Sequence, residues 1–131
     1  MMVIDTSAII AFLFDEPEAE AIESALTAAN GCTMSAFTLF ECRTVLWRRI
    51  GPSALGELEL LLQAAHIAIA PFDAEQSAMA FDAYRRYGKG SGHPAQLNLG
   101  DCAAYALAVL REAPLLFKGA DFIHTDVMRC L

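Results

Sequence analysis

Met1-Met2-Val3-Ile4-Asp5-Thr6-Ser7 opens the chain and joins a short apolar run to three side chains that favour helix starts. A short apolar run bounded by polar residues is typical of a buried strand. Asp, Thr and Ser at its end can accept hydrogen bonds from the free N–H groups of a helix's first turn. We therefore predict a buried strand at residues 1–4, followed by a helix over Ala8–Phe14.

Further apolar runs recur along the chain and are separated by segments with helical patterns. The strand candidates are Cys32–Met34, Ile67–Ala70 and Leu115–Phe117. The helix candidates are Pro17–Ala29, Ser35–Arg49 (stopped by Gly51-Pro52), Ser53–Ala65, Asp73–Gly88 and Asn98–Glu112. Uniformly apolar strands that alternate with helices indicate a parallel sheet covered on both faces. The predicted fold class is α/β, a three-layer α/β/α domain with a central parallel sheet that spans residues 1–131.

The bulk composition fits one domain with a sizeable core. The 131 residues are 56% hydrophobic and 19% charged, and no apolar run reaches the roughly 18 residues that a membrane-spanning helix needs. The four cysteines form no Cys-x-x-Cys pair, so free thiols are expected. A soluble, cytoplasmic protein without membrane contact is predicted.

The net charge of −7 argues against a nucleic-acid partner, because phosphate binding usually leaves a basic surface. Bound cations change this balance, since they reverse the sign of the local field. Discounting four acids as metal ligands from the net charge of −7 leaves −3, which reduces the conflict without removing it.

Two acids follow predicted strands, and two lie on apolar helix faces. Asp5 ends the first apolar run and Asp121 follows the last one, so both are expected at the edge where parallel strands end and ligands bind. Glu41 shares its helix face with Phe37, and Asp101 lies on an otherwise apolar helix. A carboxylate in such surroundings must be paired, protonated or bound to metal, because an unpaired buried charge is costly.

If the four acids lie close together, they form a site suited to divalent metal ions. Clustered carboxylates repel one another, which raises their pKa values, and an oxygen-only anionic site suits Mg²⁺, with Mn²⁺ as a substitute. One or two such ions can activate a water and stabilise the leaving oxygen of a phosphodiester. Each acid also has a simpler explanation: helix starts for Asp5 and Asp101, a surface position for Glu41 and a turn for Asp121.

The sequence resembles PIN domains, and within them the VapC toxins, along nearly its whole length. The matching segments are Asp5-Thr6-Ser7-Ala8, Ser35-Ala36-Phe37-Thr38-Leu39-Phe40-Glu41, Gly88-Lys89-Gly90, His93-Pro94-Ala95, Gly100-Asp101-Cys102-Ala103-Ala104-Tyr105, Leu115-Leu116-Phe117-Lys118-Gly119-Ala120-Asp121-Phe122 and His124-Thr125-Asp126-Val127. By this resemblance the catalytic and metal-binding candidates are Asp5, Glu41, Asp101 and Asp121, and Asp126 is the alternative fourth acid.

The resemblance implies a metal-dependent endoribonuclease that acts as the toxin of a toxin–antitoxin pair. It also implies an RNA substrate, with tRNA among the candidates, a VapB-type antitoxin as partner, and a homodimer. The main hypothesis is hydrolysis of RNA phosphodiester bonds by a metal-activated water. The alternative is a PIN domain that has lost catalysis and only binds a partner. A magnesium-dependent phosphatase with Asp5 as nucleophile is disfavoured, because Ser7 stands where that class carries a second Asp.

Secondary candidates flank the four acids. Ser7 and Thr6 can hydrogen-bond a metal ligand or cap the following helix. The basic candidates for RNA binding are Arg85, Arg86 and Lys89, with Arg48 and Arg49 as a second, similar pair. Cations at the end of a helix also suit the helix dipole, so a solvated helix end is the simpler explanation for both groups.

Overall fold

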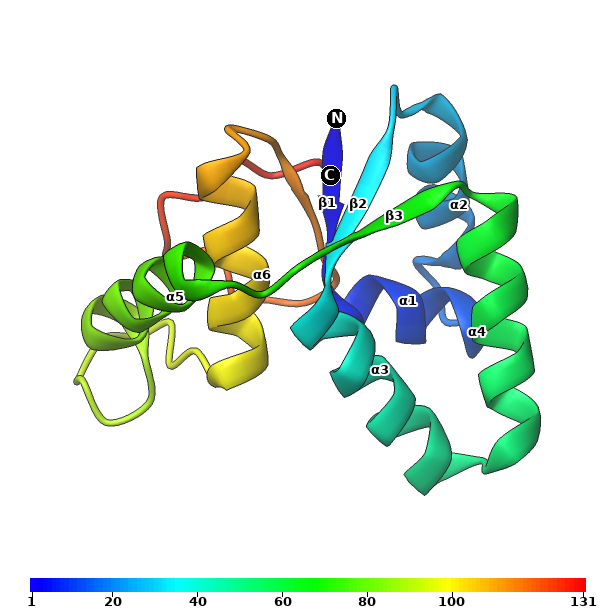
Figure 1. The fold of residues 1–131 in the computed structure, drawn as a ribbon, viewed down its shortest axis with the longest axis horizontal. Helices are drawn as coiled ribbons and strands as arrows, with labels where there is room; N and C mark the ends of the chain where they lie inside the picture. Colours follow the sequence, from blue (N-terminus) through cyan, green and yellow to red (C-terminus); the bar gives the residue numbers. More distant parts are fainter.

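A parallel four-stranded sheet runs through the middle of the computed structural model, which describes residues 1–131 (Figure 1). The strands are β1 (Met2–Ile4), β2 (Cys32–Ser35), β3 (Ile67–Ala70) and β4 (Leu115–Leu116), in the order β3-β2-β1-β4. All three neighbouring pairs are parallel, with β1 held between β2 and β4. The predicted parallel sheet is therefore confirmed.

Six helices form the two outer layers. They are α1 (Thr6–Leu13), α2 (Ala19–Ala28), α3 (Ala36–Arg49), α4 (Pro52–Ala64), α5 (Ala74–Tyr87) and α6 (Leu99–Leu110). Figure 1 shows α1 to α4 on one side of the sheet and α5 with α6 on the other. The three-layer arrangement agrees with the prediction. No helix combines the length and the apolar character that crossing a membrane would require.

Capping side chains explain where most helices begin. Asp5, Ser35, Asp73 and Asn98 each precede a helix and accept a hydrogen bond from a backbone N–H of its first turn. Pro52 was predicted as part of a helix stop, but it is the first residue of α4, a position that tolerates proline's missing N–H.

The strand β1 is buried on both faces, which explains its uninterrupted apolar sequence. Met2 and Ile4 point into the core shared with α1 to α4, whereas Val3 points into the core shared with α5 and α6. Successive side chains of a strand face opposite sides of the sheet, so a strand covered by helices on both sides needs apolar residues throughout.

The strand β3 departs from the prediction of a buried strand. Its end residues Ile67 and Ala70 are buried, but Ala68 and Ile69 are exposed. The reason is topological: β3 pairs only with β2 and forms one edge of the sheet. Sequence hydrophobicity alone does not separate an edge strand from a central one.

The chain order creates a crevice at the carboxyl end of β1. From β1 the chain moves to β2 and then β3, whereas β4 is placed on the other side of β1. Such a reversal leaves a gap outside the carboxyl ends of the strands that flank it. Asp5, Ser35 and the turn after β4 all lie at this end of the sheet.

Candidate active site

Asp5 is the first acid at this end of the sheet, and its carboxylate is only half satisfied. Its Oδ2 accepts hydrogen bonds from Ser7 N (3.0 Å) and Ser7 Oγ (2.6 Å). Its Oδ1 is buried and has no hydrogen-bond partner. The residue as a whole is 3% exposed. Asp5 therefore caps α1, as its simpler explanation proposed, and still holds one free acceptor, which a purely structural cap does not need.

Glu41 lies half-buried on α3 and is oriented by α1. Its Oε1 accepts a hydrogen bond of 2.5 Å from Thr6 Oγ1. The carboxylate also lies against Gly100 at the start of α6, where an added Cβ would collide with it. The glycine thus allows the α3 carboxylate to approach the first turn of α6, in a space that any other side chain would fill.

Asp101 also combines a helix-start role with burial at the site. It forms a reciprocal capping box with Asn98: Asp101 N donates to Asn98 Oδ1 (2.8 Å), and Asn98 N donates to Asp101 Oδ2 (3.0 Å). The residue is 8% exposed. The box fixes the side chain from two directions, so its second oxygen is held in a defined place.

The fourth acid, Asp121, lies in the turn that follows β4 and is exposed. The same segment connects to Asp5, since Lys118 N donates to Ser7 Oγ (2.9 Å), which in turn donates to Asp5 Oδ2. The turn after β4 is therefore attached to the first acid through one hydroxyl.

These groups meet in one depression of about 300 Å³, which we call the acid pocket. It is lined by Asp5, Thr6, Ser7, Ile10, Glu16, Glu41, Val45, Arg49, Asn98, Asp101, Lys118 and Asp121. All four predicted acids and the predicted supporting residue Ser7 are thus brought together. A wider cleft of about 470 Å³ lies between α2 and α4 at the opposite end of the sheet, but it lacks such a cluster of carboxylates.

Sequence reasoning missed two charged lining residues. Glu16 and Lys118 form an ion pair of 2.7 Å within the acid pocket. They are 102 positions apart in the chain, and neither lies at a helix cap or on an apolar face that would mark it. The only sequence signal for Lys118 was its place in the segment that carries Asp121, and Glu16 had none.

The surroundings of the acid pocket disfavour the ionised forms of Asp5 and Asp101. Burial raises the pKa of Asp5 to about 6, although hydrogen bonds from Ser7 act in the opposite direction. Burial raises the pKa of Asp101 to about 7, with the nearby charges of Asp5, Asp121 and Glu41 adding to the shift. A site that penalises its own negative charges in this way gains from a bound cation.

The donor set fits a hard divalent cation, although the side chains are not arranged as a finished metal site. No three Asp, Glu, His or Cys side chains could hold an ion in their present orientations. The buried, unpartnered Oδ1 of Asp5 and the all-oxygen donors suit Mg²⁺ or Mn²⁺ better than softer metals.

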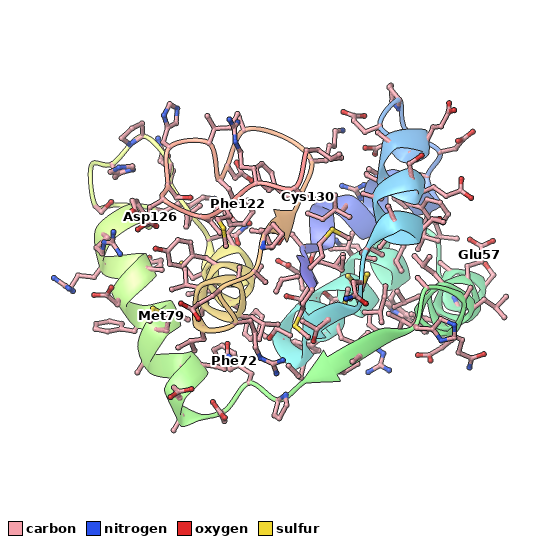
Figure 2. All side chains as sticks on the ribbon, turned by 90° about the horizontal axis from the view of Figure 1, so that it is seen from above. Glu57, Phe72, Met79, Phe122, Asp126 and Cys130 are labelled. Atoms are coloured by element: carbon pink, nitrogen blue, oxygen red, sulfur yellow. The ribbon has the colours of Figure 1, made fainter.

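Asp126, the alternative fourth acid, lies outside the acid pocket. It accepts a hydrogen bond of 2.5 Å from Tyr105 and pairs with Arg86 at 3.5 Å, and these contacts lower its pKa. Figure 2 shows Asp126 on the side of α6 that faces α5, away from α1. Of the two candidates, the structure brings only Asp121 to the other three acids.

Of the basic residues predicted to bind RNA, Arg85, Arg86 and Lys89 lie outside the acid pocket, whereas Arg49 lines it. Arg85 pairs with Asp82 at 2.6 Å, and Arg86 bridges Asp82 and Asp126 at 3.6 and 3.5 Å. Lys89 is exposed in the loop after α5. The ion pairs give the two arginines a structural role, and RNA contact by this group stays a prediction.

Comparisons with known proteins match the whole length of the fold. The PIN domain family model matches residues 2–128. Ribonuclease VapC28 of Mycobacterium tuberculosis is 46% identical over 130 residues, which cover 99% of this chain and 98% of that protein.

Two solved structures share the fold at low sequence identity. Mycobacterium tuberculosis VapC20, described as a sarcin-ricin loop cleaving toxin, aligns with a TM-score of 0.78 at 14% identity, covering 98% of this chain and 97% of that one. VapBC2 from Rickettsia felis, bound to a DNA fragment from its promoter, aligns with a TM-score of 0.75 at 14% identity, covering 98% and 95%.

Proposed function

This chain belongs to the PIN-domain family and is a toxin ribonuclease of the VapC type, and we propose that the acid pocket holds the divalent cations for its reaction. The proposed metal ligands are Asp5, Glu41, Asp101 and Asp121. The cation is Mg²⁺, with Mn²⁺ as a substitute, and the bond cleaved is an RNA phosphodiester.

One observation carries this proposal: a buried carboxylate oxygen without a partner belongs to a residue that lines one pocket with three other acids. Asp5 Oδ1 receives no hydrogen bond, in a pocket where charge is already disfavoured. Such an atom costs free energy unless a ligand satisfies it. A purely structural role leaves that cost unexplained, whereas cation binding removes it.

The protein's own groups then have definable tasks. Ser7 fixes the carboxylate of Asp5, Thr6 fixes that of Glu41, and the capping box fixes Asp101. Hydrogen bonds of this kind orient metal ligands and reduce the entropy lost on binding. The chemistry that a bound divalent cation supplies is activation of water and stabilisation of the leaving oxygen. No side chain of the pocket has to act as a covalent nucleophile.

Family membership supports the remaining assignments. We propose that residues 1–131 act as one PIN domain in the cytoplasm, where they meet RNA substrates, with tRNA as one candidate. A VapB-type antitoxin is the proposed inhibitor, because a solved neighbour is described as a toxin–antitoxin complex from Klebsiella pneumoniae. A homodimer is proposed on the family resemblance, and the molar mass in solution tests it.

Cleavage of total RNA by the purified, antitoxin-free chain tests the function. Reactions contain Mg²⁺, Mn²⁺ or chelator and are compared with the Asp101→Asn variant. The matched control is Asp126→Asn, which makes the same chemical change outside the acid pocket. We expect metal-dependent fragments from the wild type and the control but none from Asp101→Asn. Intact RNA with folded wild-type protein in every condition would favour the binding-only alternative.

A further inference from the structure

Two positively charged side chains line the acid pocket and have no part in the proposed metal binding. Of the nine Lys and Arg residues in the chain, only Arg49 and Lys118 line the pocket, against five acids. An RNA strand approaching these acids is repelled, so the cations on the pocket wall are the groups available to attract its phosphates.

The backbone of Lys118 is fixed relative to the first acid. Its N–H donates to Ser7 Oγ, which donates to Asp5 Oδ2, so two hydrogen bonds connect the residue to Asp5. The preceding residue, Phe117, packs its ring at 5.0 Å from the fully buried Phe122. A lysine anchored in this way carries its ammonium group at a limited range of positions near the reacting groups.

The side chain of Lys118 pairs with the carboxylate of Glu16, which makes no other hydrogen bond or ion pair. Lys118 Nζ lies 2.7 Å from Glu16 Oε1, and their side chains are 38% and 27% exposed. Glu16 is contributed by the turn after α1, away from the four proposed ligands in sequence. A partly exposed ion pair contributes little net stability, so a phosphate oxygen can replace the carboxylate at small cost.

We propose that Lys118 is a substrate-positioning residue that binds a phosphate of the RNA strand, and that Glu16 occupies it until RNA arrives. This inference rests on the proposed function, because it takes RNA as the ligand. Glu16 mimics the phosphate and competes with it. The pair therefore sets the affinity of the pocket for RNA. Removing the charge of Lys118 lowers that affinity, and removing the charge of Glu16 raises it.

Arg49 differs from Lys118 in a way that makes it the weaker candidate. Its guanidinium stacks over the ring of Phe14, at 5.6 Å from the ring centre, and it has no ion-pair partner. Its position at the end of α3 is not tied to any of the four acids by a hydrogen bond. Lys118 alone combines an anchored backbone with a competing carboxylate.

Binding of a labelled single-stranded RNA in Mg²⁺, followed by fluorescence anisotropy, tests the proposal. All variants carry Asp101→Asn so that the RNA stays intact. We expect Lys118→Gln to weaken binding about fivefold or more and to reduce the slope of log affinity against log salt by about 0.7, the value for one phosphate contact on a single strand. Glu16→Gln should tighten binding, and Lys118→Arg should retain it.

A double-mutant cycle separates competition from a general charge effect. Glu16→Gln removes a negative charge, which favours RNA binding even without Lys118. If Glu16 acts through Lys118, its tightening effect must be much smaller in the Lys118→Gln background. Arg111→Gln is the matched control, because it removes one cation at the far end of α6. A purely structural pair predicts weaker binding from both single variants.

Two results would overturn the proposal. One is binding by Lys118→Gln equal to that of Arg111→Gln, and the other is an undiminished Glu16→Gln effect when Lys118 is absent. Thermal melting checks that each variant folds. If Lys118→Gln does not fold, the binding of Glu16→Gln and Lys118→Arg tests the proposal instead. Cleavage by the otherwise wild-type chain is measured separately: a raised KM with little change in kcat is expected for Lys118→Gln. Binding that depends on Lys118 without any cleavage would reject the proposed function but not this inference.

Discussion

At the scale of single residues, the acid pocket is defined by carboxylates whose ionised form is destabilised by burial. Asp5 and Asp101 are almost fully buried, and burial is the largest cause of their raised pKa values. Both also cap helices, so the same side chains stabilise the helix starts and, when ionised, lower the stability of the fold. Stability and function therefore depend on pH through the same atoms.

The first prediction concerns the pH dependence of stability without metal. Because the folded pKa of Asp5 (about 6) exceeds its ordinary 3.8, its contribution to stability is fully present below pH 3.8 and is lost as the pH rises through 6. Asp5→Asn should therefore melt several degrees above the wild type at pH 8 in chelator, and close to it at pH 4. Thermal melting between pH 4 and pH 8 measures this difference.

Asp126 supplies a control of opposite sign. Its pKa is lowered, chiefly by the hydrogen bond from Tyr105, so its stabilising effect is present above the ordinary pKa and is lost in acid. Asp126→Asn should lower the melting temperature at pH 7. An Asp5→Asn variant that melts no higher than the wild type at pH 8 would contradict the burial argument.

The second prediction concerns the hydroxyl that orients Glu41. Thr6→Val keeps the shape of the side chain but removes the hydrogen bond to the Glu41 carboxylate. Loss of such an orienting contact typically costs about 10- to 100-fold in metal affinity or activity. We expect RNA cleavage to fall within that range at fixed Mg²⁺ and to recover partly at higher Mg²⁺. Thr44→Val, on the exposed side of α3, is the comparison variant and should cleave normally.

At the scale of elements, the site depends on how closely α3 approaches the start of α6. Gly100 occupies the contact, and a side chain there would collide with the carboxylate of Glu41. The residue is helical, so nothing in its backbone requires glycine. The glycine is explained by the site and not by the helix.

The third prediction follows from this contact. Gly100→Ala should strengthen the helix by roughly 0.5–1 kcal/mol through reduced backbone freedom, while it displaces Glu41. We therefore expect at least about a tenfold loss of cleavage without a large loss of melting temperature. Gly56→Ala is the matched control, because it makes the same change within α4, where no atom lies near the added Cβ. Normal cleavage by Gly100→Ala would show that Glu41 is not needed where the structure places it.

The elements also show what the sequence could predict. Local signals were sufficient for Asp5, Ser35, Asp73 and Asn98, because a cap and the helix it starts are adjacent in the chain. The exposure of β3 was not predictable, since it depends on which strand lies beside it. The Glu16–Lys118 pair was missed for the same physical reason: it is formed by tertiary packing between segments without a shared pattern.

At the scale of the whole molecule, the acid pocket carries part of the net charge of −7. Five acids and two cations line the acid pocket, so a cation bound there acts on both stability and RNA affinity. The acidic composition, which at first argued against an RNA partner, is consistent with a nuclease whose acids bind metal.

The fourth prediction is a ligand-induced rise in melting temperature. A cation that binds only the folded state stabilises it by RT ln(1 + [L]/Kd), about 2.7 kcal/mol at one hundred times Kd. We expect Mg²⁺ or Mn²⁺ to raise the melting temperature of the wild type at pH 8 by several degrees. The rise should be much smaller for Asp101→Asn and unchanged for Asp126→Asn. An equal rise in all three proteins would place the bound cation elsewhere.

The central position of β1 has a consequence for how this activity can be turned off. The amides of Val3 and Asp5 donate to Pro114 O and Leu116 O, and Met2 N donates to Gly31 O, so the strand is held from both sides. Amides in such a central strand are expected to be among the last to exchange with solvent. The first carboxylate of the site therefore follows a strand that is expected to open only with the domain itself, so local melting of β1 is not a route to inactivation. We therefore expect control of the nuclease by a partner that covers the pocket while the domain beneath it stays folded.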